Sequence, residues 1–224
     1  MFSAKENGLA VNTVKLHQIA EVSTGYSFRE QIKNDSAGDT KVIHMSDVDR
    51  YQGILTDQLK SVRDFNPRSS HYFLNSGDII LVSKGYNIHA HEIPPNLGKV
   101  VPVNSFSIIK LKMKEILPGY LTWFLNSPRA QHYFESVSMG TNIPNVTIEA
   151  LEGLEVKMPP LTQQEMIARV AQLKLKEIRI LKKLSGKKEL YVDALLGLIV
   201  EDQHKNKQKS GSERRTNADQ HRGK

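Results

Sequence analysis

The segment that most constrains this chain is MPPLTQQEMIARV, residues 158–170, where two prolines are followed at once by a helix start. Each proline restricts the residue before it to extended conformations. Two pairs of side chains match known helix-start motifs: Thr162 with Glu165 for a capping box, and Leu161 with Met166 for a hydrophobic staple. The segment therefore predicts a stiff junction between one domain and a following helix.

Beyond this junction the apolar residues recur every three or four positions, which is the spacing of an amphipathic helix of about six turns, or about 30 Å. These residues are Ile167, Val170, Ala171, Leu173, Ile178, Leu181 and Leu184. Ser185 and Gly186 form a potential interruption, and a second apolar run follows from residue 189 to residue 200. The apolar face must be buried against something, and periodicity alone leaves open whether that is its own domain or a second chain.

The residues before the junction predict an α+β fold, with a mostly-β domain that carries irregular loops and short helices. Short β-branched or apolar runs bounded by Gly, Asn and Asp predict strands at residues 41–45, 77–85, 99–103, 105–112 and 154–158. Helical spacing from residue 118 to 137 predicts two helices that are separated at Pro128, with Ser127 as the N-cap of the second. We expect three parts: residues 1–160 as this domain, 161–200 as a spacer helix region, and 201–224 as a disordered basic tail.

Composition excludes several classes of protein. The 224 residues contain no cysteine, so disulfides and thiolate metal sites are absent. The beginning of the chain has no apolar signal segment and no run approaches 18 apolar residues, so we expect a cytoplasmic protein with no membrane span. The net charge of +7, of which the tail supplies +3 through seven Lys or Arg against four Asp or Glu, suits a polyanion such as nucleic acid.

No pattern in the sequence predicts catalysis. His89 and His91 lack further ligands at metal spacing, and no phosphate-binding glycine motif occurs. Glu155 and Lys157 match the E-x-K end of a metal-dependent nuclease site, which would need Asp78 or a Glu such as Glu149 to complete it. We therefore expect no catalytic residues, no metal and no cofactor.

Three loops around the predicted sheet favour DNA binding. SKGYNIHAH, residues 83–91, combines a cation, an aromatic ring, an amide and imidazoles, which can donate and accept hydrogen bonds at base edges. Residues 49–53 and 65–73 add further groups for phosphates or bases. The candidate DNA-binding residues in these loops are Arg50, Arg68, Ser69, Ser83, Lys84, Tyr86, Asn87 and His89.

The stretch from Met139 to Val170 resembles the DNA-specificity subunits of type I restriction–modification systems. The family pattern G…IP…L…L…PPL…Q…IA is matched in order by Gly140, Ile143, Pro144, Leu151, Leu154, Pro159, Pro160, Leu161, Gln164, Ile167 and Ala168. VKLHQIAEVSTGYSF and LNSGDIILVSKG are similar to the family's opening segment and to one of its strands, so that the resemblance covers roughly residues 14–200. The chain departs from the family pattern at Gln163, where Glu is frequent.

The resemblance implies a non-catalytic subunit that reads double-stranded DNA and delivers an adenine methyltransferase subunit, and in some systems a restriction and translocase subunit, to its site. It also adds Thr141 and Asn142 to the expected DNA-facing residues. Full subunits carry two such units, whereas this chain has one, so it resembles a half-length form. The expected fold then includes pairing of the long helix as an antiparallel coiled coil or helix bundle in a homodimer that reads a gapped palindrome. The alternatives are an interaction module that binds the methyltransferase without reading DNA, and a nuclease centred on Glu155 and Lys157.

Overall fold

The computed structural model describes residues 12–63, 65, 70–138 and 143–220, with the side chains of the last helix as far as residue 199. The chain divides into two compact units, Met1–Leu175 and Lys176–Lys224. The first unit holds all the strands and the beginning of the last helix, and the second holds the rest of that helix. Among the described residues, no helix is long and apolar enough to cross a membrane.

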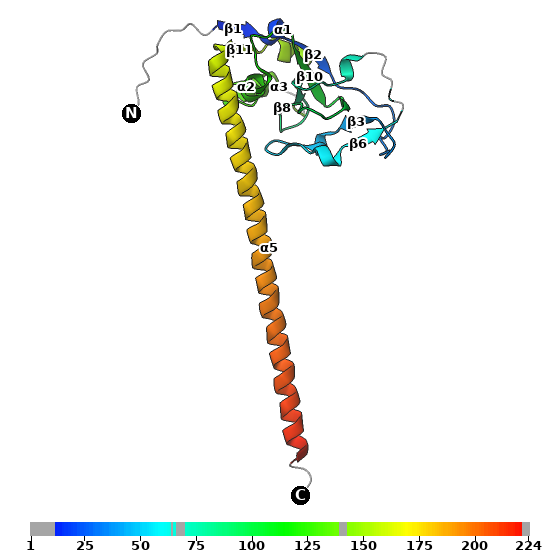
Figure 1. The fold of residues 1–224 in the computed structure, drawn as a ribbon, viewed down its shortest axis with the longest axis vertical. Coiled ribbons are helices and arrows are strands. Elements are labelled where there is room, and N and C mark those ends of the chain that lie inside the picture. Colours follow the sequence, from blue (N-terminus) through cyan, green and yellow to red (C-terminus); the bar gives the residue numbers. More distant parts are fainter. Residues whose placement is uncertain (1–11, 64, 66–69, 139–142, 221–224) are drawn as a thin grey trace, which may run out of the picture. The chain divides into compact units, whose positions relative to one another are not determined.

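A four-stranded antiparallel sheet forms the centre of the first unit (Figure 1). Its strands follow the order β2-β10-β7-β8, and their bounds are Ala20–Thr24 for β2, Ile79–Val82 for β7, Ala90–Glu92 for β8 and Phe106–Leu111 for β10. The pairing places Ile109 opposite Val22 on one side and Ile108 opposite Ile80 on the other. Strands β7 and β10, together with β9 at Lys99–Pro102, confirm three of the short strands predicted from the sequence.

Strand β7 is buried on both faces, which explains why its sequence is a continuous apolar run. Ile79 and Leu81 belong to one apolar core, which lies against helices, while Ile80 and Val82 belong to a second core. Because side chains alternate along a strand, these two pairs point to opposite faces of the sheet. The four-stranded sheet therefore separates two cores within one domain.

A second, three-stranded sheet covers the second core. Its order is β6-β3-β9, with β3 parallel to β9 and antiparallel to β6. The bounds are Thr40–Ile43 for β3, Lys60–Val62 for β6 and Lys99–Pro102 for β9. A hairpin of β4, Val48–Asp49, and β5, Gly53–Ile54, lies between them in the sequence, together with the 3-10 turns Met45–Asp47 and Thr56–Gln58. The strand expected at residues 41–45 is thus shorter, because residues 45–47 form the first of these turns.

Short helices cover the first core. Their bounds are Leu16–Ile19 for α1, Pro118–Leu125 for α2, Pro128–Ser138 for α3 and Ile148–Glu152 for α4, and a third 3-10 turn spans Ser70–Tyr72. The predicted break at Pro128 is confirmed, and the hydroxyl of Ser127 accepts a hydrogen bond from the backbone N–H of Ala130 at 3.4 Å. This bond is the N-cap interaction expected for α3.

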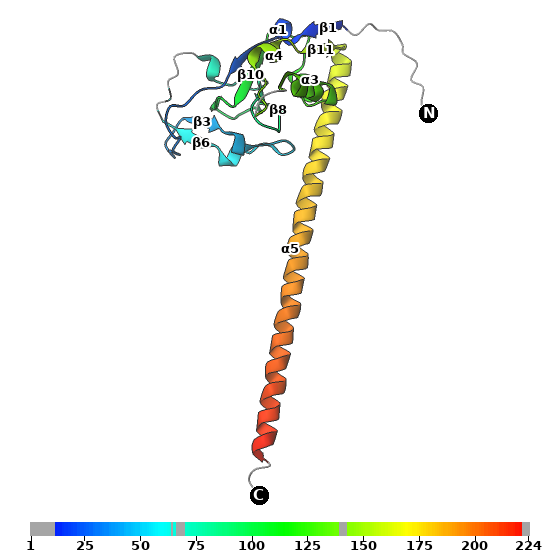
Figure 2. The ribbon, with the colours of Figure 1, turned by 180° about the vertical axis from the view of Figure 1, so that it is seen from behind.

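Strands β1, Asn12–Lys15, and β11, Glu155–Met158, pair antiparallel at the edge of the domain. Both views show this pair next to the beginning of the last helix, with β3 and β6 at the opposite end of the domain (Figures 1 and 2). The pairing joins the first described strand to the last one, so the domain is closed just before the helix starts.

The last helix, α5, spans Leu161–Gln220. The carbonyl of Pro160 accepts the first helical hydrogen bonds, from the N–H groups of Gln163 at 2.9 Å and Gln164 at 3.1 Å. The helix therefore begins two residues earlier than a capping box at Thr162 implies, and Thr162 lies inside its first turn. The prediction of a capping box and a hydrophobic staple is consequently wrong, and Leu161 and Met166 are both exposed.

The side chain of Gln164 fixes the start of α5 instead. Gln164 is fully buried, its Oε1 accepts from the N–H of Leu117 at 2.9 Å, and its Nε2 donates to the carbonyls of Glu115 at 2.8 Å and Pro159 at 2.9 Å. One amide thus joins the helix to the segment before α2 and to the proline pair. The stiff junction expected from the sequence is present, but a different residue makes it.

Helix α5 is continuous through Ser185 and Gly186, so the interruption considered there does not occur. It also continues to Gln220, into the segment expected to be a disordered tail. Residues 201–220 contain a single glycine and no proline, so nothing in the backbone chemistry stops the helix.

Candidate nucleic-acid interface

Two hairpin tips meet on the surface of the first unit. One joins β4 to β5 and carries Arg50, and the other joins β7 to β8 and carries residues 83–89. Arg50 Nη1 donates a hydrogen bond to Asn87 Oδ1 at 3.3 Å. Gly85 has φ of +103°, a left-handed conformation that glycine adopts without strain, and this permits the tight turn of the second tip. Residues far apart in the sequence therefore share one surface.

A third segment, residues 143–146, is tied to the second tip through its backbone. The N–H of Gly85 donates to the carbonyl of Pro144 at 2.8 Å, and the N–H of Val146 donates to the carbonyl of Ser83 at 2.9 Å. Lys84 and Asn145 form an antiparallel bridge between these bonds. In the sequence, this segment stands out only because Ile143 and Pro144 match the family pattern. Hydrogen bonds between distant backbone groups leave no signal in side-chain composition.

Four candidate residues lie together at these tips: Arg50, Lys84, Tyr86 and Asn87, which we call the hairpin surface. Tyr86 is 84% exposed, Lys84 and Asn87 are exposed, and Arg50 is half-buried. A cation, a second cation, an aromatic ring and an amide thus face outward on adjacent loops. This set of groups can contact phosphates and base edges.

Two further candidates are buried under the hairpin surface. The hydroxyl of Ser83 donates to the carbonyl of Ser105 at 3.1 Å, and His89 Nδ1 lies 2.7 Å from the carbonyl of Asn87. Burial lowers the pKa of His89 by more than the hydrogen bond to Asn87 raises it, so the ring is neutral at pH 7. Because a carbonyl oxygen can only accept, Nδ1–H is the donor to Asn87. Both side chains therefore hold the shape of the tip and do not face outward.

Four candidates, Arg68, Ser69, Thr141 and Asn142, lie outside the described residues. The ends of the loop that carries Arg68 and Ser69 are nevertheless placed. The rings of Phe65 and Tyr72 pack against Tyr26 with centroid distances of 4.9 and 5.1 Å. Thr141 and Asn142 directly precede residues 143–146, the segment that is bonded to the second tip.

The charged pair Glu155 and Lys157 lies on strand β11, which pairs with β1 in a different sheet from the strands that carry the two tips. Both side chains are exposed, and Glu155 Oε2 is 3.7 Å from Arg129 Nη2. Asp78, one of the carboxylates considered for the same site, directly precedes strand β7. Its Oδ2 lies 3.6 Å from Lys110 Nζ, with which it forms an ion pair. Within the described part of the chain, no group of three or more His, Asp or Glu side chains is arranged to hold a metal ion.

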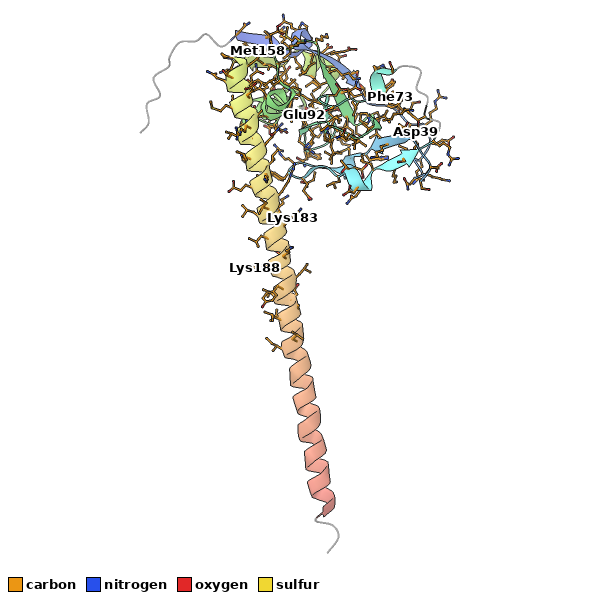
Figure 3. The ribbon with its side chains drawn as sticks, in the orientation of Figure 1. Asp39, Phe73, Glu92, Met158, Lys183 and Lys188 are labelled. Atoms are coloured by element: carbon orange, nitrogen blue, oxygen red, sulfur yellow. The ribbon has the colours of Figure 1, made fainter. Side chains whose placement is uncertain are left out.

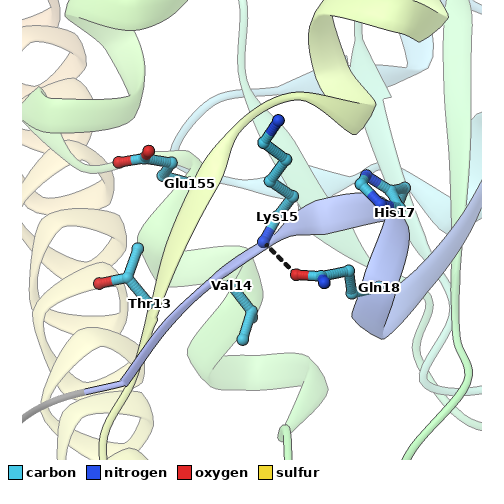
Figure 4. A pocket seen from close by; sticks show the side chains of 6 residues that line it. All are labelled: Thr13, Val14, Lys15, His17, Gln18 and Glu155. Atoms are coloured by element: carbon cyan, nitrogen blue, oxygen red, sulfur yellow. Dashed lines mark hydrogen bonds between the residues drawn. The ribbon is translucent and has the colours of Figure 1, made fainter.

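An open pocket lies beside Glu155, between β1, α1 and β11 (Figure 4). It is lined by Thr13, Val14, Lys15, His17, Gln18 and Glu155. The backbone N–H of Lys15 donates to Gln18 Oε1 at 2.9 Å, which closes the short turn at the start of α1. Of these six lining residues, only Glu155 carries a carboxylate. The lining therefore does not supply the pair of carboxylates that a metal-dependent nuclease requires.

Comparisons with known proteins agree on one family. The model of the type I restriction modification DNA specificity domain matches residues 10–189. The specificity subunit of the type I restriction enzyme MjaVIII from Methanocaldococcus jannaschii is 32% identical over 97 residues, which are 43% of this chain and 22% of the relative.

Two solved structures share the fold. A chain from work on the complex assembly and conformational transition of the type I R-M system has a TM-score of 0.59 and 20% identity, over 79% of this chain and 45% of that one. The HsdS subunit from Thermoanaerobacter tengcongensis has a TM-score of 0.58 and 16% identity, over 84% of this chain and 48% of that one. The chain thus spans less than half the length of these relatives. Since the family model covers most of its residues, the chain belongs to the family of type I restriction modification DNA specificity domains.

Proposed function

We propose that this chain is a sequence-specific DNA-binding subunit that directs an adenine methyltransferase subunit, and a restriction subunit where one is present, to a bipartite site. The observation that carries the proposal is the hairpin surface, which gathers Arg50, Lys84, Tyr86 and Asn87 on a domain of the specificity family. Phosphate contacts from the cations would position the domain, and the amide and guanidinium would read base edges.

The helix supports the second part of the proposal, that two copies act together. Among the seven residues expected on the pairing face of α5, four are exposed: Val170, Leu173, Leu181 and Leu184. Ile167 packs partly against the core of its own domain, and Ala171 and Ile178 are half-buried. An exposed apolar row of this length is unusual on a monomer and marks an interaction site. A homodimer would present two identical domains to two half-sites of a palindrome.

The test is selection of binding sites from random duplex DNA by the full chain, alone and with a type I methyltransferase subunit. We expect one enriched sequence for the wild type and a loss of enrichment for the double variant Lys84→Ala/Asn87→Ala. Arg63→Ala is the matched control, because Arg63 is an exposed arginine that pairs with Asp35 at 3.2 Å on another loop. If the wild-type chain binds the methyltransferase but enriches no sequence, the interaction module without DNA reading is the correct assignment.

A further inference from the structure

Seven of the fourteen large apolar side chains that are exposed on the described part of α5 follow a heptad repeat. Starting at Met166, steps of four and three residues alternate, which is the spacing of the a and d positions of a coiled coil. We call this row the α5 seam, and it consists of Met166, Val170, Leu173, Glu177, Ile180, Leu184, Lys187, Tyr191, Ala194 and Leu198. Every apolar member except Ala194 is more than half exposed, from 55% at Ile180 to 65% at Met166 and Tyr191.

The opposite face of the same helix is already in use in the first unit. Gln164 is buried, and Ala168 lies close to α2. A Cβ added at Gly119 of α2 would be 3.2 Å from the Cβ of Ala168. These two residues lie at heptad positions remote from a and d. The first turns of α5 therefore contact their own domain with one face and leave the α5 seam on the other.

Only two members of the α5 seam carry a charge, Glu177 and Lys187, and the charges are opposite. In an antiparallel coiled coil each a residue packs against a d residue of the other helix. Glu177 lies five positions before Lys182, and Lys187 lies five positions after it, so the two charges are at equal distances from Lys182. All other members lie in pairs at equal distances from the same point: Ile180 with Leu184, Leu173 with Tyr191, Val170 with Ala194, and Met166 with Leu198.

We propose that the α5 seam binds a second copy of this chain, antiparallel and centred on Lys182, so that Glu177 of each copy pairs with Lys187 of the other. The proposal rests on the dimer in the proposed function and adds its register. Two such ion pairs form per dimer, and every remaining layer of the interface is apolar.

Other arrangements leave these charges without a partner. A shift by one heptad places Glu177 against Ile180 or Ala194, and Lys187 against Val170 or Leu184. A parallel dimer places Glu177 against Glu177 and Lys187 against Lys187. A buried charge without its partner is strongly destabilising, whereas a buried ion pair contributes little stability but selects one register.

Five of the ten residues at the e and g positions beside the α5 seam are basic, and none is acidic. In this register, Lys174 of one copy faces Lys188 of the other, both at e positions. Lys183, at a g position, faces Lys183 of the other copy. Lys183 and Lys188 project from the helix in Figure 3. Their alkyl stems can cover the apolar layers while their charges repel. Salt screens this repulsion, so we expect the dimer to bind more tightly as the salt concentration rises.

Charge reversal tests the register through the dimer dissociation constant, measured by sedimentation with the full chain. We expect Glu177→Lys alone and Lys187→Glu alone each to weaken the homodimer by about 100-fold or more, because each places like charges together twice. A mixture of these two single variants should recover dimers, since each chain then supplies the charge that the other needs. Glu189→Lys is the matched control on the outer face, and it should leave the dissociation constant unchanged.

Cross-linking gives a second readout, because the chain has no cysteine of its own. Leu181→Cys lies beside the centre of the dimer and should be joined to its own copy by a short bismaleimide. Leu195→Cys would be separated from its copy by about 40 Å and should not be joined. Equal cross-linking of both variants indicates a parallel dimer and overturns the register.

The two proposals fail in different ways. A dimer whose affinity is unchanged by either charge reversal, or is not recovered by mixing, refutes the register and leaves the DNA-reading dimer in place. A wild-type chain that stays monomeric at all concentrations refutes both the register and the dimer, while selection of a DNA sequence still tests the reading surface.

Discussion

Gln164 holds the start of α5 through three hydrogen bonds from its buried side chain, all to backbone groups. We expect Gln164→Leu to lower the free energy of unfolding by about 3 kcal/mol, because it removes three hydrogen bonds and leaves one N–H and two carbonyls without these partners. Gln163→Leu is the matched control, since Gln163 is exposed in the same turn, and it should change stability by less than about 0.5 kcal/mol. Chemical denaturation of the two variants measures the difference, and equal stabilities would contradict the role given to Gln164.

Asn87 is oriented before any DNA arrives. Arg50 donates to its side-chain oxygen, and the buried, neutral His89 donates to its backbone carbonyl. The N–H groups of the amide and the remaining N–H groups of Arg50 then form an edge rich in donors. In the major groove, guanine offers two acceptors, whereas adenine offers one acceptor and a competing donor.

We therefore expect the selected DNA site to contain a guanine whose preference is lost in Asn87→Ala and reduced in Arg50→Lys. Replacing that guanine by 7-deazaguanine removes the N7 acceptor and should weaken wild-type binding about tenfold, with little further effect on Asn87→Ala. Inosine, which keeps both major-groove acceptors, is the control base. Loss of an adenine preference in these variants would show that the amide is oriented differently on DNA.

At the scale of elements, α5 tolerates Ser185 and Gly186 without a break. A Cβ added at Gly186 meets nothing within 4 Å, and this residue lies on the outer face of the heptad repeat. We expect Gly186→Ala to stabilise the helix by about 1 kcal/mol, because alanine loses less backbone entropy, and to leave dimer affinity unchanged. Thermal unfolding followed by circular dichroism checks this, and a lower midpoint would mean that the glycine has a packing role.

The elements themselves could be predicted to different degrees. Strand β7 and helices α2 and α3 were predictable because an apolar run between glycines and a proline after a serine are local signals. The start of α5 was misplaced, because Thr162 and Glu165 match a capping box locally while Gln164 forms its bonds with residues nearly fifty positions away. The residues of the hairpin surface were predicted on two separate loops, and the contact between Arg50 and Asn87 depends on how the sheets pack.

At the scale of the whole molecule, the chain carries one domain of the specificity family and one long helix, over less than half the length of its structural relatives. If two identical copies pair, their twofold symmetry must appear in the DNA. We expect the selected site to consist of two inverted copies of one short sequence, separated by positions without preference. Mixed binding with a variant of altered hairpin surface should then give a site with one half changed, whereas a single uninterrupted sequence would contradict pairing.

The bonds of Gln164 also have a consequence for how such proteins change over generations. Its three partners at positions 115, 117 and 159 contribute only main-chain groups, so their side chains can be exchanged without loss of the joint. An exchange of the domain before α5 would therefore have to preserve this chain path and Gln164, together with room for Ile167 and Ala168 against the domain. The start of α5 can thus keep its hydrogen bonds while the side chains of its three partner residues vary from one descendant to the next.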